Sequence, residues 1–367
     1  MARLDLKKLE TAKVRLGEAA IDPGQWVSLM EDICAATGTA GAALLQSDVR
    51  TPDIPTTRSA AEYFKNYFRN NLHLNDVRAV RGVPLLLSGK RVVTDQDIFR
   101  SEQEMMRDPL YTNLDEFGIR WWAAIGFQAG SALWGFALQR TPMEGQFQGI
   151  EIDALAQLSQ SLTDAATLSQ VAGRQVLLGV INALSHIKKP AVAMDRYGFV
   201  IDANDSANTL FDDELRIRGR RLTAADTAAR ASLDDLVDDL RNAGENDALS
   251  VFPIIVRRKT RRPIVIQAVP VPPAAKSPFL GARAVLILND LDQERAIQSN
   301  LLSKVFNLTP AEARLASLFA KDLSLDEIAN SLGISRQTAR NQLKSIFAKT
   351  GTGRQAELLS LLLRLDM

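Results

Sequence analysis

The chain has 367 residues, of which 46% are hydrophobic and 24% are charged, a composition typical of a soluble globular protein and not of a disordered one. Its 44 basic and 43 acidic residues give a net charge of +1, so any affinity for nucleic acid must come from a local basic surface. The single cysteine, Cys34, excludes an intramolecular disulfide and a cysteine-rich zinc site. The length predicts two or three domains.

The distribution of apolar residues and histidines argues against secreted, membrane-spanning and metal-binding proteins. No apolar run follows the basic residues at the N-terminus, so we expect no secretory signal. The longest apolar stretches fall far short of the roughly 20 residues that a membrane helix needs. The only histidines, His73 and His186, lie far apart in the chain, and we expect no metal site. These features favour a cytoplasmic protein that does not contact a membrane.

Residues 1–149 predict an α+β sensor domain with helices on both faces of a sheet (an α/β/α arrangement). A helix-like run precedes Gly38, which is a plausible stop. Strand-like runs follow at Ala42–Gln46, Trp121–Gln128 and Ala132–Arg140, with helical periodicity between them around Tyr63–Asn71. This mixture of helices and antiparallel strands is typical of small sensor domains.

Residues 150–187 predict one long helix or two in tandem. Leu155, Leu158, Leu162 and Ala165 follow heptad spacing, and a second leucine-rich stretch follows it from Leu177. We expect a signalling and dimerisation helix whose leucine seam faces a second copy of the chain. The alternative is a helix that packs on its own domain.

Residues 188–290 contain a hairpin-like run with Tyr197-Gly198 near its turn, a helix start near Asp205, and three late β-rich runs. This order resembles a PAS domain, which implies a five-stranded antiparallel sheet with flanking helices. Asn204 matches a recurrent asparagine of that family, and we expect its side chain to cap the next turn. His186 is the only nearby candidate haem ligand, but a histidine at a helix end more often caps carbonyls, so we expect no haem and no other cofactor.

Residues 291–306 predict a linker helix, and the segment after it, 307–367, contains a helix-turn-helix pattern. Thr309 and Glu312 form a predicted capping box, with Pro310 at the first helical position. Ser324 and Glu327 form a second predicted capping box at the start of the next helix. Gly333 then supplies a left-handed turn, after which Ser335 caps a third, longer helix.

The third helix has two distinct faces. Ala339, Leu343, Ile346 and Phe347 recur at three- and four-residue spacing and are expected to face the core. The opposite face is polar, and the stretch from Arg336 to Arg354 contains five basic residues and no acidic one. Arginine, glutamine and asparagine are the side chains that make paired hydrogen bonds to guanine or adenine edges in the major groove.

The segment from Leu308 to Leu363 resembles the C-terminal DNA-binding domain of LuxR/GerE-type transcriptional regulators. The resemblance implies an all-α, four-helix unit whose third helix reads the major groove and whose fourth helix, at 354–364, often pairs two subunits. Ala339 and Gln342 depart from the residues common in the family, so the preferred base sequence is not readable. The residues expected to contact DNA are Ser335, Arg336, Gln337, Thr338, Arg340, Asn341, Lys344 and Lys349.

The N-terminal domain contains candidate residues for binding a regulatory ligand. Residues 61–86 resemble the autoinducer-binding domains of quorum-sensing members, and a GAF-like sensor fits equally well. Because neighbouring residues of a regular strand point to opposite faces, Trp121 and Trp122 are not expected to enter one pocket together. The candidate ligand-binding residues are Tyr63, Tyr67, Asp76, Trp122 and Trp134.

The sequence thus predicts a multidomain α+β protein that acts as a homodimeric one-component transcription regulator. We expect it to bind double-stranded operator DNA under the control of a small apolar or amphipathic ligand. The alternative is control by a protein partner that binds the PAS-like domain, with no small ligand. We do not expect an enzyme, because the sequence offers no nucleophile elbow, phosphate-binding loop or metal constellation.

Overall fold

A computed structural model describes residues 4–48, 51–242, 252–292, 297–321 and 323–365. The chain forms two compact units, an N-terminal unit of Met1–Asn289 and a C-terminal unit of Asp290–Met367. Antiparallel sheets combined with many helices make it a mixed α+β protein, as the sequence predicts. Every helix in these described ranges is too short or too polar to span a lipid bilayer.

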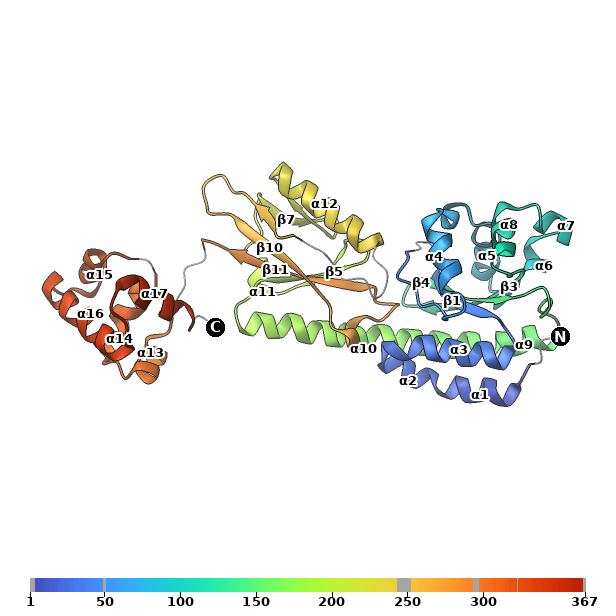
Figure 1. Ribbon diagram of the computed structural model, residues 1–367, viewed down its shortest axis with the longest axis horizontal. Coiled ribbons are helices and arrows are strands. Elements are labelled where there is room, and N and C mark those ends of the chain that lie inside the picture. The colour runs from blue at the N-terminus through green and yellow to red at the C-terminus, as the bar shows by residue number, and fades with distance from the viewer. Residues whose placement is uncertain (1–3, 49–50, 243–251, 293–296, 322, 366–367) are drawn as a thin grey trace. The chain divides into compact units, whose positions relative to one another are not determined.

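The first sheet of the N-terminal unit has four strands in the order β1-β4-β3-β2 (Figure 1). The turn between its long central strands contains Gly130, whose φ of 61° is a left-handed conformation that glycine adopts without strain. The strands expected from the sequence are all present. Their bounds are β1 Gly41–Gln46, β2 Val92–Thr94, β3 Trp121–Ala129 and β4 Ala132–Arg140.

Both faces of this sheet are covered by helices. Ile125 and Phe127 of β3 point into one core, which α1, α2, α3, α9 and α10 complete. Trp122 and Ala124 point into the other core, beneath α4 to α8. The bounds are α1 Leu6–Val14, α2 Leu16–Ile21, α3 Trp26–Thr37, α4 Ala61–Arg69, α5 Val77–Leu87, α6 Asp95–Ile98, α7 Glu102–Met105 and α8 Pro109–Glu116, with short 3-10 turns at Pro23–Gln25 and Leu72–Asn75.

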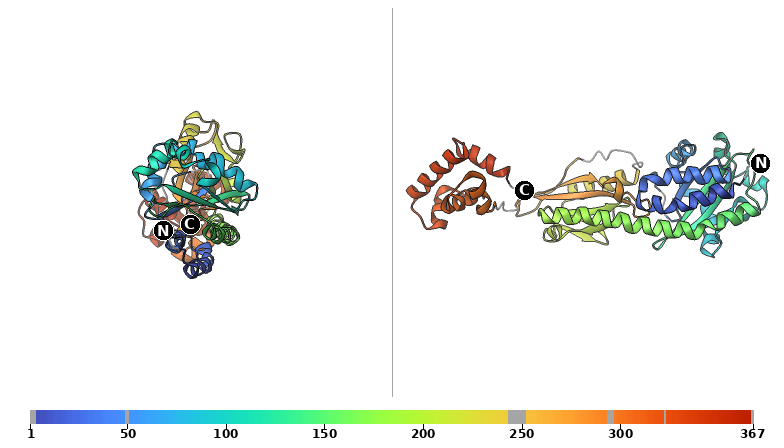
Figure 2. Two further views of the ribbon diagram at one scale, coloured as in Figure 1. Left: turned by 90° about the vertical axis from the view of Figure 1, so that its right-hand side faces the viewer. Right: turned by 90° about the horizontal axis from the view of Figure 1, so that it is seen from below.

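The predicted helix at 150–187 forms two helices in tandem, α9 (Ile150–Ala156) and α10 (Leu158–His186). The 29-residue α10 contributes to two cores, the first through Leu162 and another, farther along the chain, through Leu177 and Ile181. Figure 1 shows it running beneath both sheets, and Figure 2 shows the blue N-terminal helices lying along it, of which α2 packs against it.

The leucine seam of this helix faces its own chain. Leu155 and Leu162 are 0% and 1% exposed, because they pack on the first sheet. This corrects the expectation that they face a second copy. The residues of α10 that are exposed lie elsewhere on its surface and include Leu168 and Val171.

The second sheet has five strands in the order β6-β5-β11-β10-β9, as the sequence predicts. One face packs on α12 (Thr227–Asn242) and the other on α10. The hairpin turn holds Gly198 with a φ of 77°, and a Cβ there would lie 2.3 Å from a methyl carbon of Val237. The strand bounds are β5 Ala191–Asp195, β6 Val200–Ala203, β9 Ile254–Val256, β10 Ile264–Pro270 and β11 Ala282–Asp290.

Asn204 has the capping role that we expected. Its Oδ1 accepts hydrogen bonds from the backbone N–H groups of Ala207, 2.9 Å away, and Ala191, 3.0 Å away. It thereby caps α11 (Asp205–Asn208) and ties that helix to β5. A separate hairpin of β7 (Leu215–Arg218) and β8 (Arg221–Ala224) and a 3-10 turn at Pro273–Ala275 complete this part.

The loop before β11 joins the two halves of the N-terminal unit. Phe279 from this loop enters the first core, where its ring centroid lies 5.0 Å from those of Trp26 and Trp134. Arg196 and Arg283 of the second sheet region both contact the buried carboxylate of Asp53, at 2.9 and 2.8 Å. Apolar and ionic contacts therefore both hold the second sheet against the first domain.

The C-terminal unit consists of helices around a single apolar core. In the predicted linker at 291–306, the structure places a helix over Ser299–Phe306; residues 293–296 lie outside the described ranges. The four helices expected after it are all present. The bounds are α13 Ser299–Phe306, α14 Pro310–Phe319, α15 Leu325–Leu332, α16 Arg336–Thr350 and α17 Gln355–Leu363.

Candidate functional site

The caps of α14, α15 and α16 fix a helix-turn-helix in the C-terminal unit. Thr309 with Glu312, and Ser324 with Glu327, both form complete capping boxes. Gly333 ends α15 in the left-handed conformation, with a φ of 65°. The hydroxyl of Ser335 then accepts a hydrogen bond from the N–H of Thr338 at 3.0 Å and starts α16. These local signals set the angle at which α16 leaves the turn.

The two faces of α16 match the sequence prediction. Ala339, Leu343 and Ile346 are buried in the core of the C-terminal unit. On the other side the helix is exposed and carries no acidic residue. Seven of the eight predicted DNA-contacting residues belong to α16 and are exposed, and the eighth, Ser335, is its N-cap. The seven are Arg336, Gln337, Thr338, Arg340, Asn341, Lys344 and Lys349.

Two of the predicted contact residues are held by ion pairs within the unit. The Nε of Arg336 lies 2.7 Å from Asp326 of α15, and the Nζ of Lys349 lies 2.6 Å from Glu312 of α14. Among the described residues, no ion pair engages Arg340 or Lys344. These two exposed cations, one helical turn apart, are thus the side chains of α16 best placed to meet an anionic partner.

Glu312 joins α14 to α16 at the base of the helix-turn-helix. Burial by itself would raise the pKa of Glu312, but hydrogen bonds from Lys349, Ser345 and Thr309 outweigh it and lower its pKa to about 2. The whole residue is only 7% exposed. Lys349 therefore has a structural partner, which the sequence pattern did not reveal.

A pH dependence follows for the C-terminal unit. Because the pKa of Glu312 is lower in the folded state than its ordinary value of 4.5, its ionised form stabilises the fold above that value. We expect the stabilisation to decline as the pH falls from about 4.5 towards about 2. Calorimetric unfolding of wild-type chain and of Glu312→Gln at pH 3 to 7 measures it. Glu327→Gln is the comparison variant: hydrogen bonds from Ser324 also lower the pKa of Glu327, but this residue is exposed, so its replacement is expected to change the pH slope less than Glu312→Gln does. An equal pH slope in the Glu312 variant and wild type would contradict the assignment.

Three of the predicted ligand-binding residues are occupied by contacts within the N-terminal unit. Tyr63 and Tyr67 are buried among the aromatic rings under α4. The hydroxyl of Tyr67 donates to a carboxylate oxygen of Asp76 at 2.6 Å. The other oxygen of Asp76 caps α5 by accepting from the N–H of Arg78 at 2.8 Å. The three residues lie together, but they line neither the small pocket at Asp53 nor the small pocket between the first sheet and α5.

The predicted pair of tryptophans is split by the sheet. Trp122 belongs to the core under α5, whereas Trp134 belongs to the opposite core, against Phe279. Both nevertheless line the small pocket between the first sheet and α5. Trp121 was expected to face away from Trp122, yet both belong to the same core. Side chains point to alternating faces of the sheet from Trp122 onward. Trp121 is the first residue of β3 and does not follow this alternation.

The sequence did not reveal a chain of buried polar groups next to Trp122. The Nε of Arg78 donates to the hydroxyl of Tyr111 at 2.9 Å, and that hydroxyl donates to Asp95. The other oxygen of Asp95 accepts from the backbone N–H of Trp122 at 2.6 Å. Burial raises the pKa of Asp95 to about 6, although Arg78, Tyr111 and the Trp122 amide oppose the shift. No motif indicates this network, because its members lie far apart in sequence.

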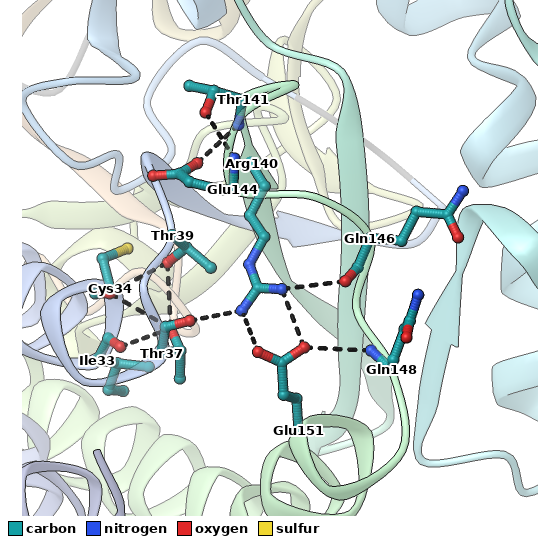
Figure 3. A network of polar contacts seen from close by, with 10 residues as sticks. All are labelled: Ile33, Cys34, Thr37, Thr39, Arg140, Thr141, Glu144, Gln146, Gln148 and Glu151. Atoms are coloured by element: carbon teal, nitrogen blue, oxygen red, sulfur yellow. Dashed lines mark hydrogen bonds and ion pairs between the residues drawn. The ribbon is translucent and has the colours of Figure 1, made fainter. Parts of the chain in front are cut away.

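A second buried network surrounds Arg140 at the end of β4 (Figure 3). Its two terminal nitrogens contact the two oxygens of Glu151 at 3.0 and 2.8 Å, and one of them also donates to the carbonyl of Thr37 at 2.7 Å. Nearby, burial raises the pKa of the Cys34 thiol to about 11, so the thiol is protonated and unreactive at neutral pH. The network joins β4, α3 and α9 and has a structural role.

The comparisons with known proteins give distant structural neighbours only. No family model and no curated protein matches the chain. It is similar to the structure titled phage VqmA-DPO complex, with 17% identity over 52% of this chain and 90% of that one, and a TM-score of 0.18. It is also similar to the E. coli DhaR(N)-DhaL complex, with 13% identity over 77% and 87% of the two chains and a TM-score of 0.23.

Proposed function

We propose that this protein is a transcription regulator that binds double-stranded DNA through α16. The observation that carries the proposal is the combination of a capped helix-turn-helix with a basic, exposed face on its longer helix. Arg340 and Lys344 are free of ion pairs within the described residues, so both can bind phosphates or base edges. Because the chain has a net charge of only +1, its affinity for DNA has to come from a local basic surface, and this face of α16 is such a surface.

The same proposal assigns the N-terminal unit to sensing. Titratable groups buried in this unit, such as Arg140 and Glu151, take part in structural networks, and we assign the unit no catalytic activity. A small molecule bound there would control the DNA-binding unit. We include homodimerisation because a single recognition helix gains strongly when a second one is held nearby. Since the α10 seam is buried, α17, which leaves Leu361 and Leu363 half-buried, is the better candidate for pairing.

The proposal is tested by selecting bound sequences from random duplex DNA with the full chain and then measuring affinity for the selected site. Arg340→Ala is expected to weaken specific binding by about 1–3 kcal/mol and to relax preference at one base pair. If each C-terminal unit neutralises about four DNA phosphates, a plot of the logarithm of the binding constant against the logarithm of the salt concentration has a slope of roughly −7 for a dimer. Lys344→Ala is expected to reduce the steepness of that slope by about 1 per C-terminal unit.

Arg314→Ala is the matched control, because Arg314 is an exposed arginine on α14 of the same unit. It is expected to leave both the affinity and the base preference near those of wild type. Equal affinity and selectivity in wild type and Arg340→Ala, or a salt slope near −1, would show that α16 does not read DNA.

A further inference from the structure

The β7–β8 hairpin, which lies beside α12 (Figure 1), carries four arginines between positions 216 and 221. Arg216 and Arg218 lie on β7, Arg220 lies in the turn, and Arg221 is the first residue of β8. The apolar residues that alternate with them point into the core beneath α12. The arginines of the two strands therefore project from the opposite face, towards solvent.

Two of these arginines lie directly opposite each other. The register of the two strands pairs Arg218 with Arg221. Side chains at such paired positions are close enough to interact, so two like charges there destabilise the hairpin. A hairpin shaped by stability alone would carry an uncharged or oppositely charged side chain at one of the two positions. Departures of this kind from the locally favourable choice are typical of functional sites.

The chain neutralises little of this positive charge. Arg216 lies 3.7 Å from Asp213, but the side chain of Asp213 is fully exposed, and such surface pairs are weak. Within the residues that the structure describes, Arg218, Arg220 and Arg221 form no ion pair, not even with the aspartates of the neighbouring α12. The hairpin thus presents a basic surface to solvent.

The other basic hairpin of this sheet region, between β9 and β10, is different. Its Arg257 lies 4.0 Å from Asp226, and its Arg261 forms an ion pair with Asp212. Those arginines therefore have acidic partners supplied by the chain itself. The comparison shows that the missing partners are a property of the β7–β8 hairpin and not of every basic hairpin in the unit.

Phe199 orders two of the guanidinium groups without neutralising them. The guanidinium carbons of Arg220 and Arg221 lie 5.4 and 4.6 Å from the centroid of its ring. A guanidinium group that rests on an aromatic ring keeps N–H groups at its edge for other acceptors. An anionic partner would therefore meet cations that are already held in position.

The arrangement fits the phosphates of duplex DNA. Arginine donates paired N–H groups to phosphate oxygens. Two residues apart on one strand, Arg216 and Arg218 are separated by about 6.6 Å along it, which is comparable with the spacing of neighbouring phosphates on a nucleic-acid strand. Single-stranded nucleic acid needs open aromatic rings for its bases, but arginines cover the ring of Phe199. The large apolar side chains of the hairpin are at least partly buried, which does not favour a membrane surface.

We propose that the β7–β8 hairpin binds the phosphate backbone of duplex DNA, as a second contact besides that of α16. The proposal goes beyond the proposed function, because it gives the N-terminal unit a direct part in DNA binding. It rests on that function only for its biological meaning. Since phosphate contacts depend on charge, this contact adds salt-dependent affinity without base preference.

The test uses the full chain with Arg340→Ala and Lys344→Ala, so that the hairpin is measured apart from α16. Binding to a short fluorescent duplex of random sequence is followed by anisotropy at several salt concentrations. In this parent chain, adding Arg216→Gln and Arg218→Gln removes two phosphate contacts. We expect affinity at low salt to fall at least about tenfold. The slope of the logarithm of the binding constant against the logarithm of the salt concentration is expected to become less steep by about 1.8.

The matched control adds Arg257→Gln and Arg261→Gln to the same parent chain. It removes the same charge from the basic hairpin that has acidic partners, and we expect affinity and slope near those of the parent. If α16 does not bind DNA, the parent binds as wild type does and the effect of the hairpin is still measured. Failure of this proposal and failure of the proposed function are therefore distinguishable.

Thermal unfolding shows whether the arginines have a structural role instead. Because Arg218→Gln removes the repulsion with Arg221, the variant with Arg216→Gln and Arg218→Gln is expected to unfold at a temperature no lower than its parent. A lower unfolding temperature would mean that these arginines stabilise the hairpin, against the proposal.

Three binding results would also overturn the proposal. The first is an equal salt slope in the parent chain and the variant with Arg216→Gln and Arg218→Gln. The second is an equal loss of affinity in the control, which would show an effect of net charge alone. The third is binding of labelled poly-glutamate, dependent on the same two arginines and at least as tight as that of the duplex, which would make an acidic polypeptide the partner.

Discussion

A chain that carries Asp at both Leu155 and Leu162 is expected to lose the fold of its first domain, not merely a contact between subunits. Both leucines are at most 1% exposed, and they lie two helical turns apart in one core. Each Asp would bury a carboxylate with no partner, at a cost of several kcal/mol. Because a whole domain is stable by only about 5–15 kcal/mol, two such changes remove most of that stability.

Circular dichroism and sedimentation distinguish the two interpretations of these leucines. We expect loss of helical signal together with aggregation. The double variant Leu168→Asp and Val171→Asp is the matched control, because these residues of α10 are 46% and 51% exposed. It is expected to retain the wild-type spectrum. If the Leu155 and Leu162 variant were instead a well-folded monomer derived from a wild-type dimer, the seam would face a second copy after all.

Replacing Asp53 with Asn is expected to loosen the second sheet from the first domain. The side chain of Asp53 is 2% exposed and contacts both Arg196 and Arg283. Asn keeps the shape but removes the charge, so two buried guanidinium groups lose their shared carboxylate. Breaking a buried ion pair in this way typically costs about 3–5 kcal/mol.

Thermal unfolding and tryptophan fluorescence measure this effect. We expect a lower unfolding temperature for the N-terminal unit and a red-shifted emission, because Phe279 shields Trp26 and Trp134 only while the two parts are held together. Asp115→Asn is the control: its partner Arg120 forms an ion pair whose carboxylate side chain is 51% exposed. If the melting curves of Asp53→Asn and wild type coincided, the ion pairs of Asp53 with Arg196 and Arg283 would not contribute to joining the two sheets.

The parts of the fold that could be predicted from sequence are those set by short-range chemistry. The capping boxes at Thr309 and Ser324 and the left-handed Gly333 depend on residues three or four positions apart, and the structure has all of them. The strand-like residue pattern likewise located β3 and β4 in the sequence. The exposed face of α16 followed from the same periodicity, so most of the candidate DNA interface was visible in the sequence.

Partners distant in the sequence were not predictable. Heptad spacing shows that one side of α10 is apolar, but it does not tell whether that side meets a second chain or the sheet of its own chain. Arginine is usually exposed, and nothing near Arg78 in sequence indicates that its partner Gln139 lies 61 residues away. The lining of the pocket between the first sheet and α5 was therefore only partly predicted: Trp122 and Trp134 were named, whereas Arg78 and the small residues beside them were not.

The shared helix α10 also constrains how such a protein is recombined with others. Its first half completes the core of one sheet through Leu162, and its second half completes the core of the next through Leu177 and Ile181. A gene fusion joined at residue 187 would leave the second sheet without the apolar surface that covers it, and would leave that surface on the first domain exposed to water. The two halves of the N-terminal unit therefore share one helix, and a chimaera that exchanges only one of them must divide α10 itself, between Leu162 and Leu177.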